Sequence, residues 1–270
     1  RSGPRSAVLV LNQMTGAALL TTDDLDTDGE EGFRIQLGCW LTPGRTSLEA
    51  TYFGIHDWES RPATADMGNL TVPFEMPIPA FTGFDVAIID YRSELDSAEL
   101  NVRCRCRNQR NLSLLTGGRY IRVREEMQLP SLTMCGVENA RYSLLTENEL
   151  LLWQGGLQSD GTLVGKLGLD VRAVAGGGVN LAYQSQQISG LRNNFSHDVQ
   201  GVYFGEALAN VTYRLGRNAR LRAGYNLLYL GGMALAPEQV NASTLANTAN
   251  TSVNAGGDLF YHGVSFGLDF

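Results

Sequence analysis

The chain has 270 residues and a net charge of −7, and 43% of its residues are hydrophobic and 18% charged. The negative charge and the lack of a basic stretch interleaved with aromatic residues exclude nucleic acid as an expected partner. No apolar run reaches the roughly 18–20 residues that a membrane-spanning helix needs, because the longest one, 163–183, is interrupted by Lys166, Asp170 and Arg172.

Apolar and polar residues alternate with a period of two along most of the chain, which indicates β-strands. In the first clear example, EGFRIQLGCWL (31–41), Phe33 and Ile35 alternate with Arg34 and Gln36. Ten strands follow from this pattern. The predicted strands are 7–21, 32–41, 46–57, 83–106, 111–129, 143–158, 162–186, 201–214, 219–232 and 258–270.

Short and long connections alternate between these strands. The tight turns are TPGR (42–45), RNQRN (107–111), SDGT (159–162) and LGRN (215–218), and the longer stretches are 22–31, 58–82, 130–142, 187–200 and 233–257. In an up-and-down sheet this places every tight turn at one end, and an even number of strands returns both termini to that end. The stretch 58–82 has room for a further hairpin, so the expected range is 8–12 strands.

Two architectures fit the alternation. An antiparallel sandwich would bury the apolar faces in a shared core, whereas a barrel in the outer membrane would turn them toward lipid. Polar faces that carry both charge signs and much glycine, long strands, and short turns opposite long loops all favour the barrel. We therefore expect an all-β fold: an antiparallel up-and-down transmembrane β-barrel of about ten strands. The barrel would cover 1–270 as a single domain, with short periplasmic turns and long extracellular loops.

The end of the chain, FYHGVSFGLDF (260–270), places apolar residues on one side of the last strand. Phe270, Leu268, Phe266 and Val264 resemble the signal that the outer-membrane assembly machinery reads, although His262 departs from it. The resemblance implies that this machinery and outer-membrane lipid are partners.

Four longer stretches resemble the planctomycete-type outer-membrane β-barrel porin family. They are EGFRIQLGCWL (31–41), 98–126, KLGLDVRAVAGGGVN (166–180) and 210–230, and they are spread over nearly the whole chain. Gly118 departs from the family pattern, where an aromatic residue is expected. The resemblance implies a cell outer-membrane location and a barrel fold.

Charged residues on the polar faces are the candidate functional residues. They would line the lumen of a porin-like barrel and select small hydrophilic solutes or ions for passive passage. The alternative is a lumen plugged by mutually neutralising charges, in a structural or interaction barrel whose loops or apolar exterior bind partners or form a homo- or hetero-oligomer. The predicted lining residues are Arg34, Glu99, Arg103, Arg105, Asp170, Arg172, Arg220 and Arg222.

Signals for metals and catalysis are weak. In DDLDTDGEE (23–31), the candidate ligands Asp24, Asp26 and Asp28 occupy the first, third and fifth positions of a calcium loop, but the twelfth is Ile35 rather than glutamate. We expect no cofactor beyond a structural divalent cation at this loop. No catalytic motif occurs, and His56 and Asp57 point to opposite faces of a strand, so no enzymatic activity is expected.

Two further features of the sequence have structural readings. The four cysteines, at 39, 104, 106 and 135, match no zinc spacing. The GGG run at 176–178 lies inside a predicted strand, where glycine permits a bend or close packing.

Overall fold

The computed structural model describes residues 8–25, 29–74, 78–106, 111–189, 192–216, 219–242 and 253–270. In these ranges thirteen strands join into one sheet, and the predicted all-β, antiparallel, barrel-type fold is confirmed. The elements are β1 (Val8–Asn12), β2 (Ala18–Thr21), η1 (Thr22–Asp24), β3 (Gly32–Thr42), β4 (Thr46–Ser60), β5 (Ala63–Thr71), η2 (Pro79–Phe81), β6 (Thr82–Ile88), β7 (Asp90–Arg105), β8 (Leu112–Leu132), β9 (Glu138–Val164), β10 (Leu167–Ile188), β11 (Arg192–Arg214), β12 (Arg220–Met233), α1 (Ala236–Ala242) and β13 (Gly257–Asp269).

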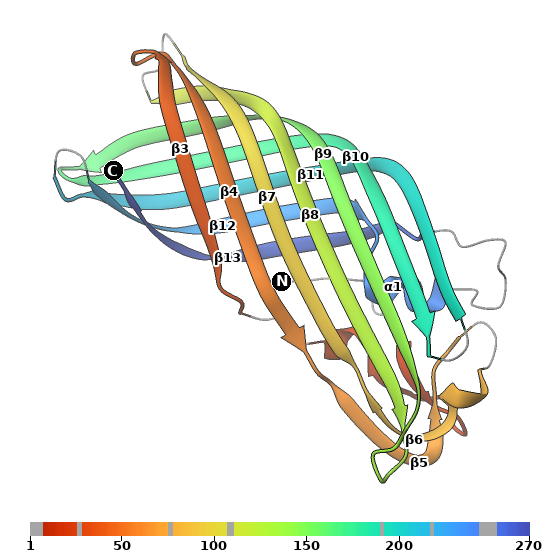
Figure 1. The fold of residues 1–270 in the computed structure, drawn as a ribbon. Coiled ribbons are helices and arrows are strands. Elements are labelled where there is room, and N and C mark those ends of the chain that lie inside the picture. Colours follow the sequence, from red (N-terminus) through yellow and green to blue (C-terminus); the bar gives the residue numbers. More distant parts are fainter. Residues whose placement is uncertain are drawn as a thin grey trace.

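Nine of these strands form a meander of antiparallel neighbours in the order β3, β4, β7, β8, β9, β10, β11, β12 and β13. The meander curls, so that β12 and β13 cross behind β3 and β4 (Figure 1). We call the concave side of the sheet its inner face and the convex side its outer face. The turn end carries the connections after β3, β7, β9 and β11, and the far end is the opposite one.

The N-terminal part differs from the prediction. The predicted strand 7–21 is a hairpin of β1 and β2, because the Asn12 side chain accepts hydrogen bonds from the backbone N–H groups of Met14 and Thr15 and closes a turn. The predicted loop 58–82 contains β5, which pairs with β1 and with β6, and β6 pairs with the last residues of β8. The predicted strand 83–106 is divided into β6 and β7. This small sheet covers the far end.

The strands also extend further toward the far end than predicted. Only 133–137 connect β8 to β9 and only 189–191 connect β10 to β11, where long loops were predicted. Polar outer residues there alternate with buried ones such as Tyr142 and Leu144, so the backbone stays in a half-exposed strand. SDGT (159–162) lies inside β9. The turn is at Gly165 and Lys166, where Gly165 takes φ 58°.

Glycines in the middle of the sheet allow β9, β10 and β11 to bend from the front wall to the rear wall (Figure 1). A Cβ atom at Gly178 would lie 1.9 Å from the carbonyl oxygen of Leu151, and one at Gly176 would lie 2.2 Å from that of Trp153. The close packing predicted for the GGG run is therefore confirmed.

A seam remains between β3 and β13. The described residues contain no ladder between these two strands. Since nine strands make up the meander, β3 and β13 both run toward the turn end. The expectation that the first and last strands meet at the turn end differs from the structure, because β1 pairs with β5 at the far end while β13 finishes at the turn end.

Candidate functional site

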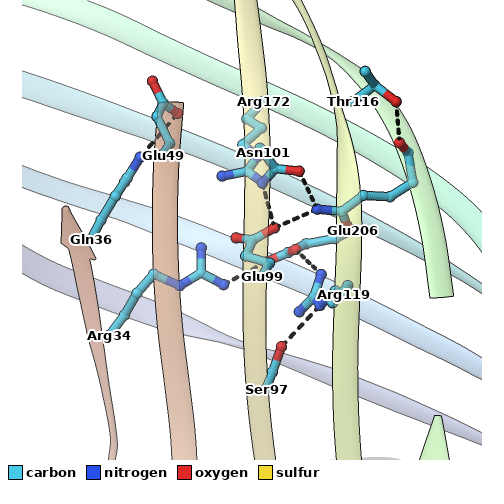
Figure 2. Close-up of polar contacts among 11 residues, drawn as sticks. Arg34, Gln36, Glu49, Ser97, Glu99, Asn101, Thr116, Arg119, Arg172 and Glu206 are labelled. Carbon is cyan, nitrogen blue, oxygen red and sulfur yellow. Dashed lines mark hydrogen bonds and ion pairs between the residues drawn. The ribbon is translucent and has the colours of Figure 1, made fainter. Parts of the chain in front are cut away.

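Five charged side chains from five strands form a layer across the interior, which we call the charged layer (Figure 2). Arg34 on β3 and Arg119 on β8 donate to the two carboxylate oxygens of Glu206 on β11, each over 2.5 Å. Arg172 on β10 donates from Nη2 to Oε2 of Glu99 on β7 over 2.8 Å. The layer therefore connects strands that are not neighbours in the sheet.

Neutral polar side chains hold the carboxylate of Glu99 in place. Gln154 donates from Nε2 to Glu99 Oε2 over 2.7 Å and to Asn101 Oδ1 over 2.6 Å, and Asn101 donates to Glu99 over 3.0 Å. Arg119 also donates from Nε to Ser97 over 2.9 Å. Each charged group of the layer thus has an ionic partner, the condition under which buried charges are tolerated.

Most of the charged layer is buried. The side chains of Arg119 and Glu206 are 1% and 2% exposed, whereas that of Arg34 is 20% exposed. Aromatic rings back the guanidinium groups: Arg34 lies over Phe53 and Arg119 over Phe204, each 5.1 Å from the ring centroid. The layer therefore joins the walls of the sheet through largely buried ion pairs.

On the turn-end side of the charged layer the inner face encloses a polar cavity of about 490 Å³, the turn-end cavity. Arg103 reaches Glu49 over 2.7 Å, and Arg105 lies 3.9 Å from Asp160. Both guanidinium groups lie against the ring of Trp40, at 5.9 and 5.8 Å. This end of the interior is wide enough for solutes and carries charges of both signs.

On the far side of the charged layer the interior is apolar and filled. Ile121, Leu150 and Leu259 belong to one buried cluster there, and each is 0% exposed. The segment after β12 folds into this space, since Asn148 exchanges two hydrogen bonds of 2.8 Å with the backbone of Ala234. Helix α1 continues this segment and contacts the far parts of β8 and β9 (Figure 1).

All eight predicted lining residues lie on the inner face, in two groups. Arg34, Glu99 and Arg172 belong to the charged layer. Four others line the turn-end cavity: Arg103 and Arg105 as above, Asp170 accepting from Gln158 over 3.2 Å, and Arg220 at 3.7 Å from Asp269. Arg222 does not line the cavity but lies 2.8 Å from Asp269, which does.

Two residues that complete the charged layer are absent from the predicted lining set. Arg119 lies between Leu115 and Ile121 on the face of β8 that the alternation pattern assigns as apolar. The pattern therefore does not include Arg119 among the polar lining residues. Glu206 lies on the predicted polar face of its strand, but only the curl of the sheet brings it to Arg34 and Arg119. An arginine in the middle of an otherwise apolar face was the available signal.

The outer face changes character along β4, β7, β8 and β9, and we call this change the face reversal. On β8, Leu114 points outward and is 53% exposed near the turn end, whereas beyond Tyr120 the outer positions are Arg122 and Arg124. Over the same stretch the inner positions become apolar, with Ile121 fully buried. One strand is therefore apolar outside in its turn-end half and apolar inside in its far half.

The face reversal lies at the same register on the four neighbouring strands β4, β7, β8 and β9. Tyr52 on β4 pairs with Ala98, Ala98 with Tyr120, and Tyr120 with Leu151. Both tyrosines donate to the first carboxylate beyond the apolar zone. Tyr52 reaches Asp96 over 2.5 Å, and Tyr120 reaches Glu149 over 3.1 Å. An aromatic ring with one apolar and one hydrogen-bonding end suits such a boundary.

The apolar residues of β13 lie on the outer face. Val264, Phe266, Leu268 and Phe270 are all exposed, from 47% for Leu268 to 94% for Phe270. They continue the apolar zone of β12, where Leu221 and its alternate neighbours point the same way.

Other candidate groups do not assemble into a site. Asp26 and Asp28 lie outside the described residues, and the Asp24 carboxylate accepts from the backbone N–H and hydroxyl of Thr21. The described residues contain no group of three or more side chains able to hold a metal ion. His56 lies 3.4 Å from Asp96 on the outer face, and the four cysteines are free thiols.

Comparisons with known proteins leave the family open, since no family description, no curated protein and no solved structure matches this chain. The resemblance to the porin family therefore stays a prediction. Among the described residues, no helix has the length and apolar character needed to cross a membrane.

Proposed function

We propose that this protein is an outer-membrane β-barrel whose turn-end half is embedded in lipid and whose far half projects into water. The face reversal carries this proposal. A sheet whose outer positions on β7, β8 and β9 are mostly apolar in the turn-end half and mostly charged or polar in the far half fits two solvents, hydrocarbon and water.

The dimensions of the apolar zone support lipid embedding. From Leu112 to Tyr120 the zone spans nine residues of β8. At about 3.3 Å per residue and a tilt of about 45°, its height is roughly 21 Å, close to the apolar band of about 25 Å in outer-membrane barrels. Recognition of Val264, Phe266, Leu268 and Phe270 by the assembly machinery belongs to the same proposal.

The packing of the interior favours a structural or interaction role over solute passage. The charged layer, the apolar cluster behind it and the segment around Ala234 fill the space between the walls. Porin-like passage of solutes would require all of these contacts to break at the same time. The far half, with the small sheet of β1, β2, β5 and β6, is the part that would meet partners in water.

The position of tryptophan residues relative to lipid tests the membrane embedding. Trp153 lies on the apolar outer zone and is 68% exposed, whereas Trp58 is buried inside. In vesicles of lipids brominated in the acyl chains, a variant that retains only Trp153 should lose most of its fluorescence, and a variant that retains only Trp58 should lose little. Equal quenching of the two, or a folded monomer that dissolves without detergent, would contradict the proposal.

Planar-bilayer recording tests the closed interior. Folded protein should insert without discrete conductance steps. Steps that disappear on charge reversal at Arg103 or Arg172 would instead support porin-like passage through each barrel.

A further inference from the structure

A row of three cations on neighbouring strands lies at the rim of the turn-end cavity. Lys166 precedes β10, Arg214 ends β11 and Arg220 begins β12. The backbone N–H of Arg214 donates to the carbonyl of Lys166 over 2.9 Å, and Arg214 is the ladder partner of Arg220. Like charges placed directly opposite each other on a sheet destabilise it. We call these three residues the cation row.

The described residues neutralise the cation row poorly. Lys166 and Arg214 have no ion pair there, and Arg220 lies 3.7 Å from Asp269, whose shorter contact of 2.8 Å is with Arg222. The other two carboxylates of the cavity, Asp160 and Asp170, face each other four residues deeper along β10, about 13 Å from the row. The rim is therefore cationic, although carboxylates are present further inside.

A fourth cation faces the cavity from the opposite wall. Arg105 on β7 lies 3.9 Å from Asp160, and its buried Nε has no hydrogen-bond partner among the described residues. The guanidinium groups of Arg103 and Arg105 both lie over the ring of Trp40, which favours these positions. Guanidinium groups bind phosphate oxygens through paired hydrogen bonds.

From this arrangement we propose that the turn-end cavity is a binding site for a small phosphate-type oxyanion, held at the rim by the cation row. The cavity of about 490 Å³ exceeds the needs of one phosphate and admits a pyrophosphate or a small phosphate ester, whose remaining part would extend toward the wall that carries Arg105. An oxyanion here would remove the repulsion within the row. The site is independent of membrane embedding, because it forms on the inner face of the folded chain.

Calorimetric titration of the folded protein in neutral detergent, at constant ionic strength set by chloride, tests the site with inorganic pyrophosphate. The variant K166Q/R214Q/R220Q should bind at least tenfold more weakly than the unaltered protein. The matched control R61Q/R92Q/R141Q removes three cations from the outer face, each of them ion-paired, and should change the affinity less than twofold. Binding of neither pyrophosphate nor the phosphatidylglycerol of the parallel titration by the unaltered protein, or equal losses in both variants, would overturn the proposal.

Two further measurements complete the test. A short-chain phosphatidylglycerol below its micelle concentration replaces pyrophosphate in a parallel titration. Row-dependent binding of pyrophosphate identifies a free solute, and row-dependent binding of the lipid alone identifies a headgroup.

Without anion, the triple variant should unfold at the same or a higher temperature, since the repulsion is gone. If that variant does not fold, R214Q alone should weaken binding threefold or more, and an unchanged affinity would overturn the proposal.

Discussion

At the scale of single residues, the inner face holds groups that cannot be exchanged without cost. Gly178 has no room for a methyl group, and Glu206 forms ion pairs with two arginines at once. Each position allows a substitution with a matched control elsewhere in the sheet.

Replacing Gly178 by alanine should destabilise the fold by about 1–3 kcal/mol, because the new Cβ would overlap the carbonyl of Leu151 and push β9 and β10 apart. Gly205 on the adjacent strand has nothing within 4 Å of its Cβ position, so Gly205→Ala should be neutral or slightly stabilising. Denaturant unfolding in micelles measures both. Equal unfolding midpoints for the two variants would show that β9 and β10 can separate locally without loss of stability.

Glu206→Gln should cost roughly 3–5 kcal/mol, because it removes the buried carboxylate that pairs with both Arg34 and Arg119. The control is Glu59→Gln. Glu59 pairs with Arg92 on the surface, where both side chains are more than half exposed, so the loss should stay below about 1 kcal/mol. A loss for Glu206→Gln no larger than that of the control would mean that water enters the charged layer.

At the scale of elements, the two free edges of the sheet need an explanation. In hydrocarbon, unpaired backbone N–H and C=O groups along β3 and β13 would each cost several kcal/mol. Trp40 near the end of β3 and Asp269 at the end of β13 line the same cavity, so the two strand ends lie close to one level. We expect the seam to be closed in lipid by a parallel ladder, since both strands run toward the turn end.

A cross-link tests the closure of the seam. Cys39 is a free thiol on the exposed face of β3, and Leu268 lies on the corresponding face of β13. With the other cysteines replaced by serine, Leu268→Cys or the neighbouring Phe266→Cys should form a disulfide with Cys39 under mild oxidation in vesicles. Leu157→Cys on β9 serves as the distant control and should stay reduced. If neither seam position forms a disulfide with Cys39, the edges of β3 and β13 do not pair with each other.

The limits of prediction from sequence are clear at this scale. The eight lining residues could be assigned because alternation is strict in the turn-end half, where polar side chains face inward. The same rule fails for Arg119, since the inner face of β8 becomes apolar around it. The pairing of Arg34 with Glu206 could not be predicted either, because it depends on how far nine strands curl. Strand ends at the far end were misplaced since polar outer residues there were read as loops.

At the scale of the whole molecule, the face reversal predicts a large and a small effect of the same substitution at two heights. Val171 and Gln187 both point outward on β10, on the apolar side and the polar side of the boundary. Val171→Lys should reduce folding stability in vesicles by about 2–4 kcal/mol, as for a charge on a lipid-facing strand. Gln187→Lys should change it by less than about 0.5 kcal/mol. Similar small effects at both positions would mean that water surrounds the whole outer surface.

The nine-residue distance from Leu112 to the tyrosine boundary also determines which membranes suit the protein. A hydrocarbon slab thicker than this zone would cover Arg122 and its neighbours or force the lipids to thin around the wall. Vesicles with short acyl chains should therefore accept the chain more readily than those with long ones. The length of the apolar zone between Leu112 and Tyr120 therefore determines the bilayer thickness that suits the protein, independently of any partner.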